Sequence, residues 1–317
     1  LQDAIETAEL GCAPELRDDL HAAFPTAMQE KFAAAIDDHR LRNEIVATKL
    51  ANRVVNRLGI LNPFELAEEE GAAMGDIVAM FVVAEDLFGL RALWSEIETI
   101  AMPEAARIAL FNEVATATRS QIADLLRATS PGTQPGVVIE RMRAGITKLD
   151  AQTKALLRDE ASAHSGRIAD ALEAVGAPRD LSQKVVRLFE MDGAVGLADL
   201  GERLRLDEAD LTRGFTHLGQ ALGLDWAQAI AARIASSDPW ERLLIAGLAR
   251  DFQQLRLEFL ARGGDENPEA FVTGWLEANA QRVAQFRSLV DRARQAAQPN
   301  AAMLAQIAGQ ARVLLGR

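Results

Sequence analysis

Residues 41–59 have the sequence LRNEIVATKLANRVVNRLG, and this stretch decides the fold class. Its apolar residues recur three or four positions apart, which is the period of one face of an α-helix. The glycine at position 59 is typical of the residue that ends a helix. The spacing therefore predicts one helix with one buried stripe. The apolar positions of that stripe are Leu41, Ile45, Val46, Leu50, Val54 and Leu58.

The flanking sequence carries the same helical signals. Three dipeptides, Asn62-Pro63, Asp238-Pro239 and Asn267-Pro268, place an N-cap acceptor before a proline at the first helical position. No segment alternates apolar and polar residues as a half-buried strand would. We therefore predict an all-α fold, a multi-helix array. The predicted helix ends lie at Gly59, Gly71, Gly89, Gly176, Gly193, Gly223 and Gly263-Gly264.

A segment rich in proline and glycine, SPGTQPG at 130–136, divides the array. It predicts an N-terminal helical subdomain over residues 1–130, which carries the 41–59 helix, and a C-terminal subdomain over residues 131–317. Short runs recur between the two at one constant offset along the chain, which relates Gly59 to Gly193 and Phe81 to Phe215. The two subdomains are therefore either related copies of one unit or a coincidence of helical sequences, and both alternatives stay open here.

The composition is that of an ordinary globular chain. Among 317 residues, 49% are hydrophobic and 25% are charged, and no apolar run approaches the roughly 18 residues that a membrane span needs. The only cysteine, Cys12, excludes an internal disulfide and fits a reducing compartment, so we expect a cytoplasmic protein that binds no membrane. Leu1 in place of an initiator methionine favours a segment of a longer polypeptide.

Charge is distributed unevenly along the chain. The net charge is -12, yet residues 278–317 hold six arginines against one aspartate, Asp291. An acidic body repels a phosphate backbone, so we expect no nucleic-acid partner. The basic tail is either a solvated helix face or a surface that docks on an acidic one.

Signals of catalytic chemistry are missing from the sequence. No glycine-rich turn follows a predicted strand, so we expect no nucleotide cofactor in this chain. No two of the histidines His21, His39, His164 and His217 lie within one helical turn, and we expect no metal site. The Cys12 thiol has no basic neighbour in the sequence to activate it. We therefore name no catalytic residue.

Two other features are interpreted as structural. Residues 66–77 look like the start of a helix-turn-helix, but residues 76–88 contain no Lys, Arg, Asn or Gln to read base edges, so this helix is predicted to be buried. A second segment with the same pattern begins at Asp207 with acidic residues that would repel phosphates. The four tryptophans are predicted to fill the core rather than to contact a partner. They are Trp94, Trp226, Trp240 and Trp275.

The 41–59 helix is also far more specific than its periodicity requires. It resembles the C-terminal helical region of the large bacterial NAD-specific glutamate dehydrogenases. Further matching runs are Leu87-Phe88-Gly89-Leu90-Arg91-Ala92-Leu93-Trp94, Leu222-Gly223-Leu224-Asp225-Trp226 and Asp238-Pro239-Trp240-Glu241.

The resemblance implies a parent enzyme of amino-acid catabolism, an oxidoreductase that converts L-glutamate and NAD to 2-oxoglutarate, ammonia and NADH. It places the catalytic residues and the NAD site upstream, so this chain is expected to be non-catalytic and to support assembly or regulation. It implies two partners: the upstream catalytic domain of the same polypeptide and further copies of the parent in a homo-oligomer. Glu44, Asn52, Asn56 and Arg57 match the signature helix and are candidates for an inter-domain interface. The alternative is an independent helical scaffold or regulatory protein without enzyme activity.

Overall fold

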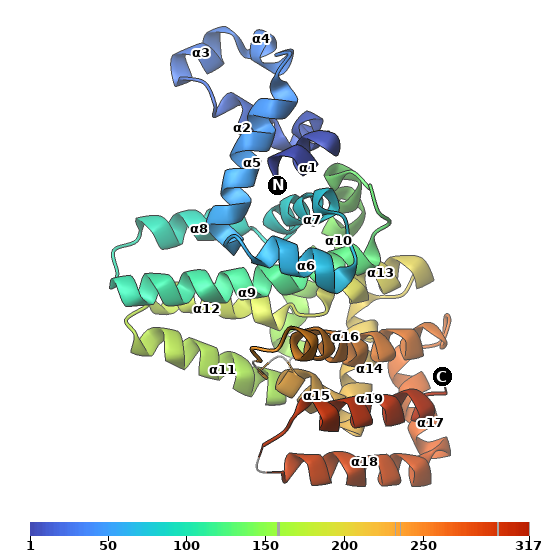
Figure 1. Cartoon of the computed structure of the whole chain (residues 1–317). Helices are drawn as coiled ribbons and strands as arrows, with labels where there is room; N and C mark the ends of the chain where they lie inside the picture. Colours follow the sequence, from blue (N-terminus) through green and yellow to red (C-terminus); the bar gives the residue numbers. More distant parts are fainter. Residues whose placement is uncertain (157–158, 232, 235, 297, 317) are drawn as a thin grey trace. The chain divides into compact units, whose positions relative to one another are not determined.

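The computed structural model describes the backbone of residues 1–156, 159–231, 233–234, 236–296 and 298–316, and side chains within these ranges except at 152–164 and 239. In these ranges every regular element is an α-helix or a short 3-10 helix, which confirms the predicted all-α fold (Figure 1). The chain divides into two compact units. Unit 1 comprises residues 1–147 and 165–195, and unit 2 comprises residues 148–164 and 196–317.

Unit 1 begins with short helices and continues with longer ones. Its helices are α1 (Gln2–Thr7), η1 (Leu10–Cys12), η2 (Pro14–Leu16), α2 (Arg17–His21), α3 (Thr26–Lys31), α4 (Ala33–Asp37), α5 (Arg42–Leu58), α6 (Asn62–Glu70), α7 (Met74–Leu87), α8 (Leu90–Thr99), α9 (Glu104–Ala128) and α12 (Arg179–Glu190).

Unit 2 holds the remaining complete helices. These are α14 (Glu208–Leu222), α15 (Leu224–Ala231), α16 (Pro239–Ala261), α17 (Pro268–Ala278), α18 (Ala280–Arg294) and α19 (Ala301–Leu314). Three further helices, α10 (Pro135–Leu156), α11 (Asp159–Ala174) and α13 (Ala194–Leu204), contain the points where the chain passes from one unit to the other.

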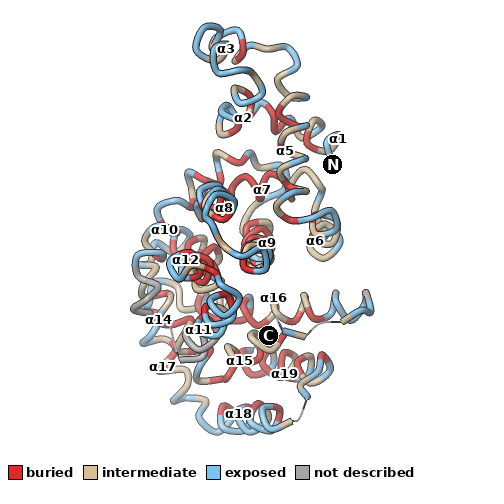
Figure 2. The backbone as a smooth tube through the Cα atoms, turned by 90° about the vertical axis from the view of Figure 1, so that its left-hand side faces the viewer, coloured by how far each residue is buried: buried red, intermediate tan, exposed pale blue. Residues whose placement is uncertain are grey.

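The core of unit 1 forms around α7. Residues 77–85 of this helix are all buried, because α1, α6, α8 and α9 pack against it (Figure 2). The expectation that this segment is a core helix is confirmed. Complete enclosure explains why its sequence is apolar on every side rather than on one stripe.

In unit 2 the core lies between α14, α15, α16 and α19. The buried stripe of α16 contains Phe252, Leu255 and Phe259, and the Phe259 ring lies 5.0 Å from the rings of both Phe271 and Trp275. Helix α18 contributes only a thin apolar stripe and is exposed along most of its length (Figure 2).

The 41–59 segment forms α5, as predicted, and its buried stripe runs through Val46, Leu50, Val54 and Leu58. The prediction that Leu41 belongs to this stripe was wrong, because Leu41 precedes the helix as its N-cap residue and is 44% exposed.

The predicted helix starts were right in two cases of three. The Asp238 carboxylate accepts the amide of Glu241 at 2.9 Å, and Asn267 accepts that of Ala270 at 3.1 Å. Asn62 is not an N-cap, because it lies inside the first turn of α6. Its amide nitrogen donates to the carbonyl of Leu58, while its oxygen accepts from Arg119 at 2.9 Å.

The predicted helix ends agree with the backbone. Positive φ values occur at each of the seven predicted positions, with Gly264 as the left-handed member of the last pair. The division at residue 130 stays a prediction. Residues 131–147 and 165–195, which it assigns to the second subdomain, belong to compact unit 1.

Candidate interaction surface

Helix α5 carries all four candidate interface residues, and the structure separates them into two groups. Glu44, Asn52 and Asn56 are exposed and lie outside the buried stripe of α5. Arg57 is half-buried, with a side chain 18% exposed. The first three are therefore open to a partner, whereas Arg57 already has partners within unit 1.

The Arg57 guanidinium lies over two aromatic rings. Its central carbon is 5.2 Å from the ring centre of Trp94 and 5.8 Å from that of Phe111, and these two rings stack at 5.2 Å. The same side chain also pairs with Glu98. A cation over aromatic faces is attracted by the ring quadrupoles, so Arg57 fastens α5 to α8 and α9.

A second arginine of α5 belongs to a network of four charges around the buried carboxylate of Glu85. Arg53 pairs with Asp19, and its guanidinium is 3.0 Å from the Glu85 carboxylate. Arg91 pairs with the same two acids at 3.0 and 3.3 Å. Glu85 is only 2% exposed, and this burial raises the pKa of its carboxyl, although both arginines oppose the rise.

The network ties α2, α5, α7 and α8 together. Breaking such a cluster by removing one member leaves the other charges buried without compensation, which is costly. No sequence pattern predicts this network. The available signal was that Glu85 and Asp86 follow the apolar run of α7, and of these two only Glu85 is buried.

The first turn of α5 holds the N-terminal segment. The Asn43 side chain accepts the amide of Gly11 at 3.0 Å and donates to the carbonyl of Glu6 at 2.8 Å. Arg42 donates to the carbonyls of Gly11 and Ala13 at 3.1 and 3.4 Å. A side chain at position 11 would collide with the backbone of residue 43, so the close approach requires glycine.

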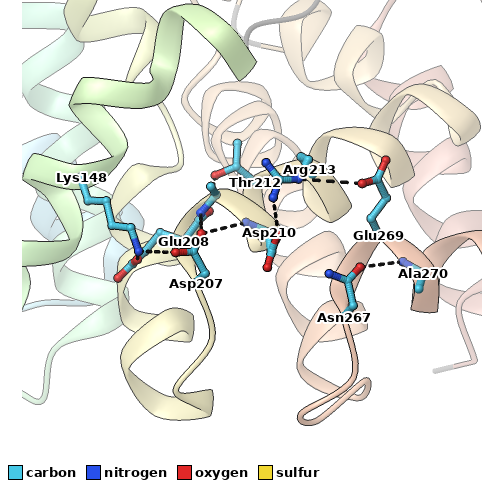
Figure 3. Close-up of polar contacts among 10 residues, drawn as sticks. Lys148, Asp207, Glu208, Asp210, Thr212, Arg213, Asn267, Glu269 and Ala270 are labelled. Carbon is cyan, nitrogen blue, oxygen red and sulfur yellow. Dashed lines mark hydrogen bonds and ion pairs between the residues drawn. The ribbon is translucent and has the colours of Figure 1, made fainter.

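In unit 2, polar side chains gather where α14 and α17 begin (Figure 3). The Asp207 carboxylate caps α14 by accepting the amides of Ala209 and Asp210 at 2.8 and 3.3 Å. Lys148 pairs with Asp207 and, at 2.9 Å, with Glu208. This contact lowers the pKa of Asp207 and raises the pKa of Lys148.

Arg213, the basic residue of this second helix-turn-helix-like segment, is also held by acids. It pairs with Asp210 one turn earlier and lies 3.8 Å from Glu269 of α17 (Figure 3). The charged groups at this helix start are therefore used for capping and ion pairing. The absence of a nucleic-acid partner stays a prediction.

Two of the histidines, His21 and His39, are engaged in local structure, whereas the buried Nδ1 of His217 has no hydrogen-bond partner among the described residues. The His21 ring is 2.8 Å from the Asp37 carboxylate. Arg17 and then His21 hold the pKa of Asp37 down to about 2. The His39 ring accepts the amide of Leu41 at 3.1 Å, and the His164 side chain lies outside the described residues. No three His, Cys, Asp or Glu side chains of the described residues group as metal ligands would.

An acidic cavity of about 480 Å³ opens beside the N-terminal segment. Carboxylates of Glu9, Glu15 and Glu140 line it together with Cys12, which is exposed. Like charges would repel the pyrophosphate of a dinucleotide from this cavity.

The tryptophans do not share one role. Trp94 is 1% exposed and fills the core as predicted, and Trp226 and Trp275 are half-buried. Trp240 contradicts the prediction, because it is 80% exposed in the first turn of α16.

The arginines of the basic tail also differ from one another in exposure and contacts. Arg287 and Arg292 are exposed, Arg282, Arg294 and Arg312 contact other residues of unit 2, and Arg317 lies outside the described residues.

None of the helices in the described part of the chain combines the length and apolarity that crossing a membrane requires.

Comparison with known proteins identifies a family that matches almost the whole chain. Residues 1–312 match the family model described as "Glutamate dehydrogenase, C-terminal".

Three relatives are described as NAD-specific glutamate dehydrogenases. The protein from Mycobacterium tuberculosis is 27% identical over 98% of this chain and 20% of its own length. Those from Pseudomonas aeruginosa and Halomonas elongata are 25% and 23% identical over 92% and 88% of this chain, and in both the match covers 18% of the relative. The chain thus spans about a fifth of the length of these curated relatives.

Proposed function

Because the chain belongs to the glutamate dehydrogenase C-terminal family, we propose that it is the non-catalytic helical domain of an NAD-dependent glutamate dehydrogenase. The parent reaction converts L-glutamate and NAD to 2-oxoglutarate, ammonia and NADH. The domain supports assembly or regulation of that enzyme in the cytoplasm, and its partners are the upstream catalytic domain and other copies of the parent. The match over residues 1–312 is the observation that carries the proposal.

The use of polar side chains on α5 agrees with a supporting role. Arg42, Asn43, Arg53 and Arg57 all bind other parts of unit 1. Such residues stabilise the domain and are not available to a substrate. The exposed residues of the same helix form the candidate interface with the catalytic part.

Activity and cofactor binding of the isolated chain test the non-catalytic role. We expect no glutamate-dependent formation of NADH, followed by absorbance, and no heat of binding when NAD is titrated in a calorimeter. NAD is the natural probe because the parent reaction uses it. Stoichiometric binding of NAD, or turnover of glutamate, would overturn the proposal.

The interface is tested in the full-length enzyme by replacing Glu44, Asn52 and Asn56 with alanine together. Since all three side chains are exposed, the melting temperature of the isolated domain should stay unchanged while assembly or activity of the enzyme falls. Glu277→Ala, which removes an exposed carboxylate of α17 in unit 2, is the matched control. Unchanged assembly and activity in the triple variant would refute this role of α5.

A further inference from the structure

Two sets of consecutive helices correspond along the chain. Helices α6 to α9 and α13 to α16 follow one another in the same order with similar lengths. Helix α7 begins at residue 74 and α14 at residue 208, while α8 begins at residue 90 and α15 at residue 224. In both cases the two helix starts are separated by the same number of residues as Phe81 and Phe215. The offset noticed in the sequence therefore also relates the helix boundaries.

The turns between these helices correspond as well. Gly71 ends α6 with φ +62°, and its counterpart at the same offset, Arg205, follows α13 with φ +56°. At both turns the next amide donates to the carbonyl five residues before it, at 3.1 Å. A left-handed conformation is unfavourable for arginine, so its presence at this position indicates that both turns keep one inherited geometry.

Buried positions match between the two sets. At each of the following pairs, which share this offset, both side chains are buried: Leu66 and Leu200, Ile77 and Leu211, Phe81 and Phe215, Ala84 and Leu218, Leu90 and Leu224, Leu93 and Ala227, Ile97 and Ala231. From helix order, turn geometry and core positions together, we infer that the two sets are copies of one helical unit.

The copies differ at one apolar turn, which we define as Ile60 and Leu61 between α5 and α6 together with Phe64 in the first turn of α6. These side chains are 67%, 69% and 54% exposed. Exposure of three large apolar side chains within five residues of the chain is unusual, and clustered exposed apolar side chains are typical of interaction sites. The corresponding residues of the second copy, Ala194, Val195 and Ala198, are 4%, 1% and 5% exposed. The same place in the unit is thus covered in one copy and open in the other.

The apolar turn is held rigidly although it is exposed. Asn62, in its middle, bonds both the end of α5 and Arg119 of α9. Arg119 also contacts both carboxylate oxygens of Glu69 at 2.5 Å. A surface fixed in this way loses little conformational entropy when a partner covers it.

The net charge of this chain and the length of its relatives indicate which partner fits the apolar turn. Pairing of the apolar turn with its own copy would bring two acidic chains together, each with a net charge of -12, and would place Glu68 and its neighbours in α6 near their counterparts. In the relatives, about four fifths of the polypeptide lies outside the region that this chain matches. A different part of the same enzyme is therefore the better occupant.

We propose that the apolar turn is the docking surface for the catalytic remainder of the glutamate dehydrogenase polypeptide. This inference rests on the proposed function and makes it specific. In this proposal the exposed Asn56, four residues before Ile60 in the sequence, forms a polar rim of the contact.

Site-specific photo-cross-linking in the full-length enzyme tests the proposal. A benzophenone amino acid replaces Leu61 in one sample and Val313, an apolar side chain of α19 with 61% exposure, in the control. We expect cross-links from position 61 to peptides upstream of this domain, with a yield at least fivefold above that from position 313. Cross-links that map to residues 1–317 of another copy, or a yield no higher than the control, overturn the proposal.

A double variant, Leu61→Ser with Phe64→Ser, provides a second measurement. Both side chains are exposed, so the isolated domain should keep its melting temperature. In the full-length enzyme, limited proteolysis should release the domain at least tenfold faster than in the wild type. An unchanged release rate would contradict the docking role. The position of the cross-link does not depend on whether the domain binds NAD, so this proposal and the non-catalytic role can fail separately.

Discussion

Replacing Arg205 with glycine should stabilise unit 2. Arg205 is one of two described non-glycine residues with positive φ, and its backbone completes the turn after α13. Its amide donates to the carbonyl of Glu202 at 3.4 Å, and the Leu206 amide donates to that of Gly201 at 3.1 Å. These are the two hydrogen bonds of a Schellman motif, in which the left-handed position normally holds glycine.

The magnitude follows from two opposing terms. A left-handed conformation costs an L-residue about 1–2 kcal/mol, and glycine removes this cost. Glycine also increases the conformational entropy of the unfolded chain, which offsets about 0.4–1 kcal/mol. We expect a net gain of about 0.5–1 kcal/mol, because the Arg205 side chain is exposed and contributes little packing.

Urea denaturation and hydrogen exchange measure the effect. Global unfolding should shift to higher urea concentration, and exchange of amides in α13 and α14 should slow by about twofold to fivefold, since 1.4 kcal/mol corresponds to a factor of ten. Arg205→Ala is the matched control, because it removes the same charge but keeps the Cβ atom and the strain.

A reciprocal variant completes the test. An added Cβ at Gly71 would meet no atom within 4 Å, so Gly71→Ala introduces conformational strain without a clash. It should destabilise unit 1 by about 1 kcal/mol. If Arg205→Gly lowers stability, or Arg205→Ala raises it equally, the reasoning from turn geometry is wrong.

Three further changes test the buried network, a helix cap and an exposed tryptophan. The folded-state pKa of Glu85 is raised, so the native state binds this proton more tightly, and the associated stability is present at low pH and lost as pH rises through the folded pKa. In urea titrations, the stability of the wild type relative to Glu85→Gln should therefore increase as the pH is lowered from 8 to 5. The opposite slope would show that the attraction of the two arginines affects the pKa of Glu85 more than its burial does. Asp238→Ala should lower the free energy of unfolding by about 1 kcal/mol in the same assay, because it leaves the Glu241 amide without its cap. Asp238→Asn, which keeps an acceptor oxygen, should retain most of this stability. Trp240→Ala should change the free energy of unfolding by less than about 0.5 kcal/mol, because the ring is 80% exposed; a loss above about 2 kcal/mol would place it in a packed site.

Most local features of the fold could be predicted from the sequence. The helix-ending glycines and the caps at Asp238 and Asn267 depend on hydrogen bonds within one or two turns, and the residues that make them are adjacent in the chain. The burial of α7 was equally predictable, since an apolar helix without a polar face must be enclosed.

The candidate site was predictable only in part. The signature helix was predicted, and three of its four candidate polar residues are exposed. Arg53 and Arg57 are equally charged in the sequence, yet one joins a buried ion network and the other lies over two rings. These roles depend on Asp19, Glu85 and Phe111, which are distant along the chain.

The sequence by itself thus determined that the chain is helical, where most helices end and which side of α5 is buried, because backbone hydrogen bonding and hydrophobic periodicity act over a few residues. Only the tertiary structure decided that Asn62 braces a turn, that Trp240 is exposed, and that Ile60, Leu61 and Phe64 remain open while their counterparts in the second copy are covered. Whether an apolar side chain is covered depends on which distant segments pack over it, and no local pattern specifies this.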